Sequence, residues 1–232
     1  MPVSGVPSRQ MFSDGVRALF PAGVALGVAR VGEGRTADLL TDELAGLDRM
    51  APARAAEFIA GRLALRHAQK SLSVAGFAVP NAADRSPQWP EGFCGSISHA
   101  RGLAVAVLAH RSERLLSIGV DIEDDSALPA DLHDIVLVPE ERAALADKVD
   151  AGQQAKAVFV VKEAVYKAQY PLTGRLFGFD QISVSLHPQT GCFDARFNAG
   201  IAPFRAGERL NGRYSACGGL VIAGLVACAA RQ

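Results

Sequence analysis

The chain has 232 residues, of which 49% are hydrophobic and 21% are charged, a composition typical of a globular protein with a buried core. Lysine plus arginine and aspartate plus glutamate each number 24, so no overall field favours nucleic acid or a membrane surface as a partner. Any basic site must therefore be local.

Cysteine usage and apolar segments indicate the compartment. Four cysteines lie far apart without a Cys-x-x-Cys or paired histidine spacing, which argues against zinc and against a disulfide framework: Cys94, Cys192, Cys217 and Cys228. We expect buried thiols in a reducing compartment. Residues 1–20 carry no basic segment followed by an unbroken apolar run, and the longest apolar stretch, 220–230, is shorter than the roughly 20 residues that cross a bilayer. A cytoplasmic protein is predicted.

The first half of the chain predicts a long helix followed by strands. The helix covers residues 52–73 and begins with a proline, which suits the first turn. A loop rich in Pro, Asp, Asn and Trp follows at 80–92. Three short β-prone runs come next, separated by turn residues: 94–99, 103–109 and 115–123. This order predicts a helix packed on an antiparallel meander.

The second half repeats that order. A helix over about 154–170 precedes β-prone runs at 181–186, 192–197 and 220–228. Two local echoes favour a duplication: the segment that begins at Gly102 resembles the one at Gly219, and Ala64-Leu-Arg-His-Ala-Gln resembles Ala164-Val-Tyr-Lys-Ala-Gln. Chance similarity in an alanine-rich chain is the alternative. Under duplication, a cleft between two related lobes is the expected site.

Two of the three candidate metal ligands come from the run over 115–123. In an extended strand, alternation places Asp121 and Glu123 together on the face opposite Val120 and Ile122. The alternative interpretation is the solvated end of a strand.

The third carboxylate comes from the second helix. Val158, Val161, Val165 and Ala168 form its apolar stripe, and the opposite face carries Phe159, Glu163, Tyr166 and Lys167. An ordinary i,i+4 pair also explains Glu163 and Lys167. Three converging carboxylates fit a hard divalent cation, and nearby lysines imply phosphate, so the pattern predicts Mg²⁺-dependent chemistry on a phosphoester.

Polar residues upstream could hold a phosphate. Ser98 and His99 lie where a strand gives way to a turn and could hold a phosphate, but taken alone this motif is better explained by a plain turn with His99 as a polar surface residue. Arg54, Arg62 and Arg66 follow one ridge of the first helix and could grip a phosphate, with a solvated helix face as the alternative.

The loop between the first helix and the strands adds another cation. Arg85 lies in a proline-stiffened segment with Trp89, a residue type used more often for packing than for ligand binding. There is no Gly-x-Ser-x-Gly elbow, which argues against a serine hydrolase, and no glycine-rich phosphate or dinucleotide loop.

Five motifs in order resemble the Sfp-type 4'-phosphopantetheinyl transferases, in the subgroup typified by the enterobactin-synthetase enzyme. The resemblance covers roughly residues 54–170 and rests on Phe58-Ile-Ala-Gly-Arg62, Trp89-Pro90-Glu-Gly, Gly95-Ser-Ile-Ser98-His99, Gly119-Val-Asp121-Ile-Glu123 and Lys162-Glu163-Ala-Val-Tyr166-Lys167. It implies a mixed α/β (α+β) fold of two similar lobes, 1–117 and 118–232, related by a pseudo-twofold axis. Each lobe would be a helix on a small, largely antiparallel sheet, with the active site between them.

The resemblance also implies the reaction and its residues. The enzyme would move 4'-phosphopantetheine from coenzyme A to a serine of an acyl or peptidyl carrier protein and release 3',5'-ADP. Mg²⁺, or Mn²⁺ in its place, would be held by Asp121, Glu123 and Glu163. The phosphates of coenzyme A would be held by Arg54, Arg62, Ser98 and His99, with Arg66 and Arg85 as weaker candidates. Lys162 and Lys167 would stabilise phosphate oxygens, and Glu163 could also accept the serine proton.

Partners and alternatives remain to be separated by experiment. We expect a monomer that binds an apo carrier near Phe177 and Phe179, and neither nucleic acid nor a membrane. The carrier could serve siderophore or other nonribosomal peptide, polyketide or fatty-acid synthesis. Two other classes are open: a protein that sequesters coenzyme A or a carrier without catalysis, and a Mg²⁺-dependent phosphoester hydrolase.

Overall fold

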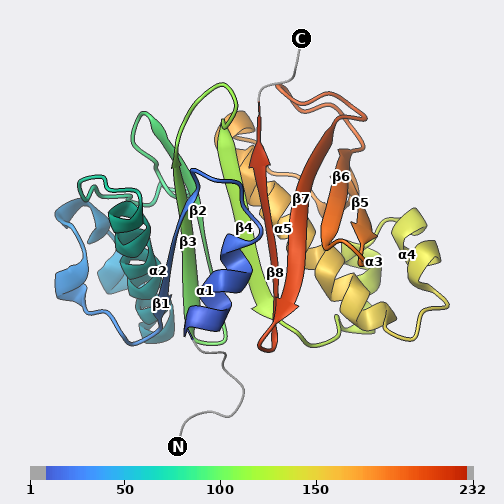
Figure 1. Ribbon diagram of the computed structural model, residues 1–232, viewed down its shortest axis with the longest axis horizontal. Helices are drawn as coiled ribbons and strands as arrows, with labels where there is room; N and C mark the ends of the chain where they lie inside the picture. The colour runs from blue at the N-terminus through green and yellow to red at the C-terminus, as the bar shows by residue number, and fades with distance from the viewer. Residues whose placement is uncertain (1–8, 229–232) are drawn as a thin grey trace, which may run out of the picture.

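The computed structural model describes residues 9–228, which form two antiparallel sheets with helices packed on them (Figure 1). The three-stranded sheet has the order β1-β3-β2, from Ala25–Arg30, Leu103–His110 and Phe93–Ala100. The five-stranded sheet has the order β4-β8-β7-β6-β5, from Ser117–Asp124, Leu220–Ala227, Arg209–Cys217, Cys192–Phe197 and Ile182–His187. The expected mixture of helices and antiparallel sheets in two lobes is confirmed.

Two long helices each cover one of these sheets. The helix α2 (Pro52–Ser71), with Pro52 in its first turn, packs on β1 and β3, and α5 (Ala151–Thr173) packs on β4 and β8. We call the first sheet with α2 the N-terminal lobe and the second sheet with α5 the C-terminal lobe. The shorter α-helices of the described residues are α1 (Arg9–Arg17), α3 (His133–Val136) and α4 (Pro139–Leu145). Short 3-10 helices lie at Thr36–Asp38, Thr41–Glu43, Leu47–Arg49, Ala130–Leu132 and Phe179–Gln181.

A glycine lets the long helix approach its sheet closely in both lobes. A Cβ on Gly27 of β1 would lie 1.9 Å from the carbonyl oxygen of Ala64, and one on Gly119 of β4 would lie 1.9 Å from that of Ala164. Only glycine permits such an approach of backbone to backbone. The two halves of the Ala64/Ala164 echo therefore hold equivalent places, which supports a duplicated plan.

The two lobes also share one apolar core on the face opposite α2 and α5. Phe12 and Val16 of α1 contact a cluster drawn from β1, β3, β4 and β8, so α1 lies across both sheets (Figure 1). Separate clusters fill the space under α2 and under α5. A continuous buried apolar layer therefore joins the two lobes.

The strand order differs from the predicted meander. β4 pairs with β8 and heads the second sheet, and the edge next to β3 is taken by β1, which the sequence pattern did not reveal. β2 meets β4 through side chains: the backbone N–H groups of Val120 and Ile122 donate to the hydroxyls of Ser96 and Ser98 at 3.1 and 3.3 Å. The predicted division at residues 117 and 118 stays a prediction, although the second sheet begins at Ser117.

The structure bears on two further predictions, the burial of the cysteines and the absence of a membrane-spanning segment. All four cysteines are free, but only Cys94 is buried; Cys192 and Cys217 are half-buried and Cys228 is exposed, so the prediction of buried thiols was wrong for three of them. Within residues 9–228, no helix is long and apolar enough to cross a membrane. The prediction about residues 1–20 falls partly on residues 1–8, which lie outside the described residues. The same holds for residues 229 and 230 at the end of the apolar stretch.

Candidate active site

A cavity of about 500 Å³ lies between the two lobes. It is lined by α2, the segment 81–89 and β2 on one side, and by β4 and α5 on the other. The predicted site residues that line it are Arg54, Arg62, Arg85, Ser98, His99, Asp121, Glu123, Glu163 and Lys167. The structure thus brings together most of the side chains that the motifs suggested, and its two walls carry unlike charges.

Arg54 and His99 form the basic corner of the cavity. Arg54 Nη1 donates to His99 Nε2 at 2.5 Å and lies 3.4 Å from Glu57 Oε2, while His99 Nε2 is 3.7 Å from the same carboxylate. Burial lowers the pKa of His99, and Glu57 opposes this effect. A neutral imidazole that accepts a hydrogen bond from the guanidinium follows. An anion in the cavity could displace Glu57 as the partner of Arg54.

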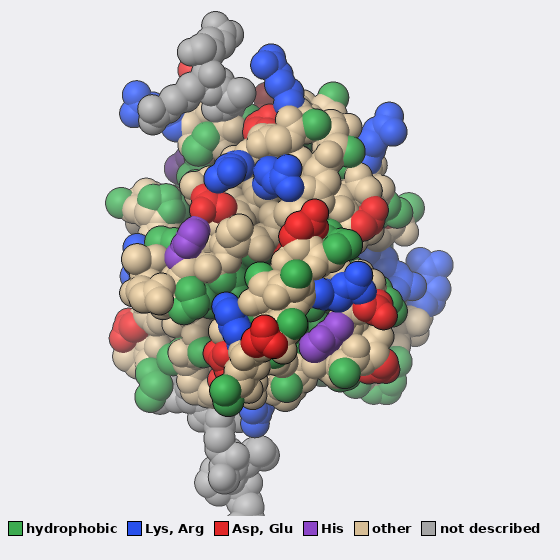
Figure 2. Space-filling model, turned by 90° about the vertical axis from the view of Figure 1, so that its right-hand side faces the viewer, with side chains coloured by type: hydrophobic (Ala, Val, Ile, Leu, Met, Phe, Trp, Pro, Cys, Tyr) green, Lys and Arg blue, Asp and Glu red, His purple; other side chains and the backbone are tan. Residues whose placement is uncertain are grey.

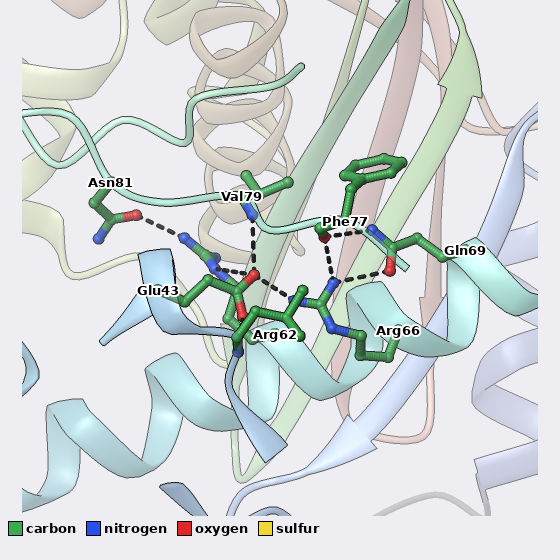
Figure 3. A network of polar contacts seen from close by, with 8 residues as sticks. Glu43, Arg62, Arg66, Gln69, Phe77, Val79 and Asn81 are labelled. Carbon is green, nitrogen blue, oxygen red and sulfur yellow. Dashed lines mark hydrogen bonds and ion pairs between the residues drawn. The ribbon is translucent and has the colours of Figure 1, made fainter. Parts of the chain in front are cut away.

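Arg62 lines the cavity from a buried position. It is 4% exposed, donates from Nη2 to Asn81 Oδ1 at 2.7 Å, and its guanidinium carbon lies 4.4 Å from the centre of the Phe58 ring. Its Nε is 3.8 Å from Glu43 Oε1 (Figure 3). Desolvation lowers the pKa of Arg62 to about 10, and Glu43 opposes this shift, so the side chain stays charged at neutral pH.

Arg66 does not reach the cavity. Its guanidinium donates to Gln69 Oε1 at 2.8 Å, to the carbonyl oxygen of Phe77 at 2.7 Å, and to Glu43 (Figure 3). These three acceptors hold its Nη1 and Nη2 groups inside the N-terminal lobe, and its buried Nε has no hydrogen-bond partner. The expected phosphate contact by Arg66 is therefore not supported by its geometry.

Ser98, Asp121 and Lys167 join the lobes at the floor of the cavity. Ser98 Oγ donates to Asp121 Oδ1 at 2.8 Å, and Lys167 Nζ donates to the same oxygen at 2.7 Å. Ser98 also accepts the N–H of Ile122, so its hydroxyl cross-links β2 to β4 in this structure. The second carboxylate oxygen of Asp121 is buried without a hydrogen-bond partner. A buried orphan acceptor of this kind is a reason to expect a ligand there.

Two further carboxylates crowd Asp121. Burial raises the pKa of both Glu123 and Glu163, and in each case the negative charge of Asp121 raises it further. In the described part of the chain, no three His, Cys, Asp or Glu side chains are arranged so that together they could bind a metal ion. The arrangement fits Mg²⁺, which takes one or two protein carboxylates and completes its shell with water and phosphate oxygens.

Lys162 lies outside this cavity, contrary to expectation. Its side chain is 1% exposed, and its Nζ donates to Glu141 Oε2 at 2.8 Å and to the carbonyl oxygens of Val136 and Phe179 at 2.8 and 3.0 Å. All three donors of the ammonium group are occupied, so Lys162 holds α5 to its own lobe. Phe159, expected on the same helical face as Glu163, packs against Phe179 with ring centres 5.6 Å apart.

A smaller cavity of about 230 Å³ adjoins the first. The two share Glu163, Tyr166 and Leu176, and the smaller one is otherwise lined by Lys162, Phe177, Gly178, Phe179 and Ile182. Leu176, at the boundary of both, is 76% exposed. The walls are mainly apolar and aromatic, which suits an uncharged chain better than a phosphate.

The rim of the large cavity links the lobes again. Tyr170 of α5 donates its phenol to Asp84, which also accepts hydrogen bonds from Ser86. Hydrogen bonds from Tyr170 first, and then from Ser86, lower the pKa of Asp84. Arg85 lines the cavity next to this contact, and Trp89 packs against Gly95 of β2.

Several residues of the site carry no signal in the sequence. Glu57 follows Arg54 by one helical turn and could have been suspected as its partner. Glu43, Asn81 and Glu141 are far in the chain from the side chains they contact. Elsewhere, the face that carries α3, α4 and β5 shows basic and acidic side chains interspersed with scattered apolar ones, as the balanced charge predicts (Figure 2).

Comparison with known proteins gives consistent matches along the chain. A model of the 4'-phosphopantetheinyl transferase N-terminal domain matches residues 42–109, and one of the 4'-phosphopantetheinyl transferase superfamily matches residues 117–209. The 4'-phosphopantetheinyl transferase Svp of Streptomyces mobaraensis is 33% identical over 82% of this chain and 79% of its own length. The 4'-phosphopantetheinyl transferase PptT of Mycobacterium tuberculosis is 31% identical over 81% and 85%, and enterobactin synthase component D of Salmonella typhi is 35% identical over 57% and 55%.

Proposed function

Because the chain belongs to the 4'-phosphopantetheinyl transferases, we propose that it moves 4'-phosphopantetheine from coenzyme A to a serine of an acyl or peptidyl carrier protein and releases 3',5'-ADP. One observation carries this proposal: the interlobe cavity has three guanidinium groups and an imidazole on one wall, and three carboxylates with an orphan oxygen on Asp121 on the opposite wall. A pyrophosphate that binds a divalent cation on one side and arginines on the other fits between such walls.

Each wall has its own part in the proposed reaction. Arg54, Arg62 and His99 would hold phosphate oxygens of coenzyme A, with Arg85 at the rim. Asp121, with Glu123 or Glu163 beside it, would hold Mg²⁺, which when bound supplies Lewis-acid stabilisation of the charge on the pyrophosphate.

The chain's own groups then position the reactants. The carrier serine oxygen forms a bond to the β-phosphorus, the bond from that phosphorus to the bridging oxygen breaks, and 3',5'-ADP leaves. Lys167 lies at the floor of the cavity, where its ammonium group can stabilise charge on phosphate oxygens. Glu163 is the candidate acceptor of the serine proton because burial and Asp121 raise its pKa. A carboxylate bound to Mg²⁺ is a poorer base, so its two roles oppose each other.

The small adjoining cavity suits the rest of the donor. It opens from the large cavity at Glu163 and Tyr166, and its aromatic walls at Phe177 and Phe179 fit the uncharged pantetheine arm better than a phosphate. The carrier would dock at the mouth beside Leu176, whose exposed side chain offers an apolar contact. This placement would bring the carrier serine to the end of the arm that carries the phosphate.

The carrier and the compartment are also proposals. Enterobactin synthase component D is named for a siderophore synthase, so carriers of siderophore and other nonribosomal peptide synthesis come first among those to test. We place the reaction in the cytoplasm, where the four free cysteines would stay reduced.

Release of 3',5'-ADP with and without an acceptor tests the proposal. Purified enzyme, coenzyme A and Mg²⁺ should release 3',5'-ADP only when an apo carrier is added. Release without any carrier would indicate a hydrolase instead. Tight binding of coenzyme A with no release across a panel of carriers would indicate a sequestering protein.

A further inference from the structure

The two lobes bury the same arrangement around a glutamate. In the N-terminal lobe, Glu43 accepts the backbone N–H groups of Leu40 at 3.1 Å and Val79 at 2.9 Å. In the C-terminal lobe, Glu141 accepts those of Val138 at 2.8 Å and Val184 at 2.6 Å. Each glutamate thus bonds the backbone three residues before it and a segment that follows the long helix.

Each glutamate also holds a cation of that helix. Glu43 pairs with Arg62 and Glu141 pairs with Lys162. Both cations stand two residues before the alanine over which the sheet glycine packs, Ala64 or Ala164, so they occupy equivalent positions. The two clusters are therefore copies of one structural plan.

The copies differ in charge. The pair of Glu141 and Lys162 has no net charge. The ammonium group of Lys162 donates hydrogen bonds to Glu141 and to two carbonyl oxygens. Glu43 instead contacts two guanidiniums, Arg62 and Arg66 (Figure 3), which leaves this cluster with one positive charge in excess.

That excess charge faces the cavity. Arg66 is the nearer partner of Glu43 and also bonds Gln69 and Phe77, whereas Arg62 lies 3.8 Å from Glu43 and lines the cavity. The positive charge of Arg66 also disfavours charge on Arg62, and Glu43 offsets this repulsion. Removal of Glu43 would leave two guanidiniums that repel each other in a buried place, and Arg62 would turn from its present position.

We propose that Glu43 is a positioning residue for anion binding: it fixes the guanidinium of Arg62 at the cavity wall, while Arg66 supplies the extra charge. This rests on the proposed function, in which Arg62 binds phosphate. Glu43 does not line the cavity, and neither does Glu141, its counterpart in the C-terminal lobe, which pairs with Lys162 instead.

The matched variants Glu43→Gln and Glu141→Gln test this. Binding of 3',5'-ADP, which lacks the pantetheine arm, is measured by titration calorimetry on folded enzyme, and thermal unfolding is recorded for both. We expect both variants to unfold at lower temperature, because each leaves a buried cation without its counter-charge. Glu43→Gln should raise the Kd about tenfold, as for the loss of one charge-assisted contact, while Glu141→Gln should change it less than about twofold.

The outcomes separate this inference from the function itself. An unchanged Kd for Glu43→Gln, or equal weakening by both variants, would overturn the positioning role. Wild-type enzyme that binds neither 3',5'-ADP nor coenzyme A would overturn the proposed function instead. Should Glu43→Gln fail to fold, Arg66→Met provides the second test, because it keeps the Glu43 and Arg62 pair but removes the excess charge. It should weaken 3',5'-ADP binding although Arg66 lies outside the cavity, and an unchanged Kd would contradict the argument.

Discussion

The two lobes share a backbone plan and differ in the charge they present to the cleft between them. Both pack a long helix onto a strand through a glycine, Gly27 or Gly119, and both bury a glutamate with a cation of that helix. The N-terminal wall presents three arginines and a histidine together with the carboxylates of Glu57 and Asp84, whereas the C-terminal wall presents three carboxylates and Lys167. Two lobes with a similar helix-on-sheet plan can thus supply complementary half-sites, one suited to phosphate and one to a cation.

Loss of charge on the acidic wall should have the largest effect. Asp121→Asn keeps the shape of the side chain and an oxygen for the bond from Ser98, but removes the charge that would bind the cation. We expect transfer to fall by on the order of 100-fold or more, measured as the initial rate of carrier modification at saturating coenzyme A. Asp124→Asn is the control, because Asp124 ends the same strand, pairs with Lys156 and does not line the cavity. Equal losses in both variants would argue against a specific role for Asp121.

The buried pair of the C-terminal lobe should govern stability. Lys162→Met leaves Glu141 buried and unpaired, so the free energy of unfolding in urea should fall by roughly 3–5 kcal/mol. The double variant Lys162→Met/Glu141→Gln should recover part of this loss, because no buried charge remains. The enzyme that stays folded should keep its Kd for 3',5'-ADP, because Lys162 does not line the large cavity. A large rise in that Kd with unchanged stability would instead place Lys162 in the phosphate site.

Loss of charge on the basic wall should weaken donor binding more than catalysis. Arg54→Gln removes a guanidinium that would contact phosphate, and the KM for coenzyme A should rise about tenfold or more with a smaller change in kcat. Arg101→Gln is the control, because this exposed arginine bonds the carbonyl of Gly219 and does not line the cavity. A fall in kcat alone for Arg54→Gln would contradict a binding role.

The smallest expected effect is on the pH dependence of stability. Glu163 has a folded pKa above its ordinary value of 4.5, so its favourable contribution is present below pH 4.5 and is lost as pH rises through the raised pKa. Without divalent cations, Glu163→Gln should therefore be slightly more stable than wild type at pH 7, by less than about 1 kcal/mol, and less so at pH 5. Urea unfolding at the two pH values measures the difference. A variant that loses stability equally at both values would show that burial of the Glu163 charge, together with repulsion from Asp121, is not the cause.

Short-range pattern predicted the acidic wall well. Alternation over 115–123 placed Asp121 and Glu123 on one face, and both line the cavity. Helical periodicity likewise put Val161, Val165 and Ala168 in the core and Glu163 and Lys167 toward the site. These inferences succeed because a strand or helix fixes the directions of its own side chains.

Contacts between distant segments could not be predicted in this way. The choice of β1 rather than β4 as the neighbour of β3 depends on pairing across the sheet, and Ser96 and Ser98 give no sign that their hydroxyls bond another strand. Lys162 was assigned to the site from a family motif, but its direction is set by Glu141, which the sequence does not link to it. The contacts of buried charged residues such as Lys162 can therefore be assigned only from the three-dimensional structure.

The mass of the carrier protein tests the central claim most directly. Apo carriers from nonribosomal peptide, polyketide and fatty-acid synthesis are each incubated with the enzyme, coenzyme A and Mg²⁺, and intact masses are recorded, with Asp121→Asn in parallel. We predict that at least one carrier gains the mass of a single phosphopantetheine group at its serine with the wild-type enzyme and gains it far more slowly with the variant. Unchanged masses across the panel, with folded enzyme that binds coenzyme A, would contradict the account.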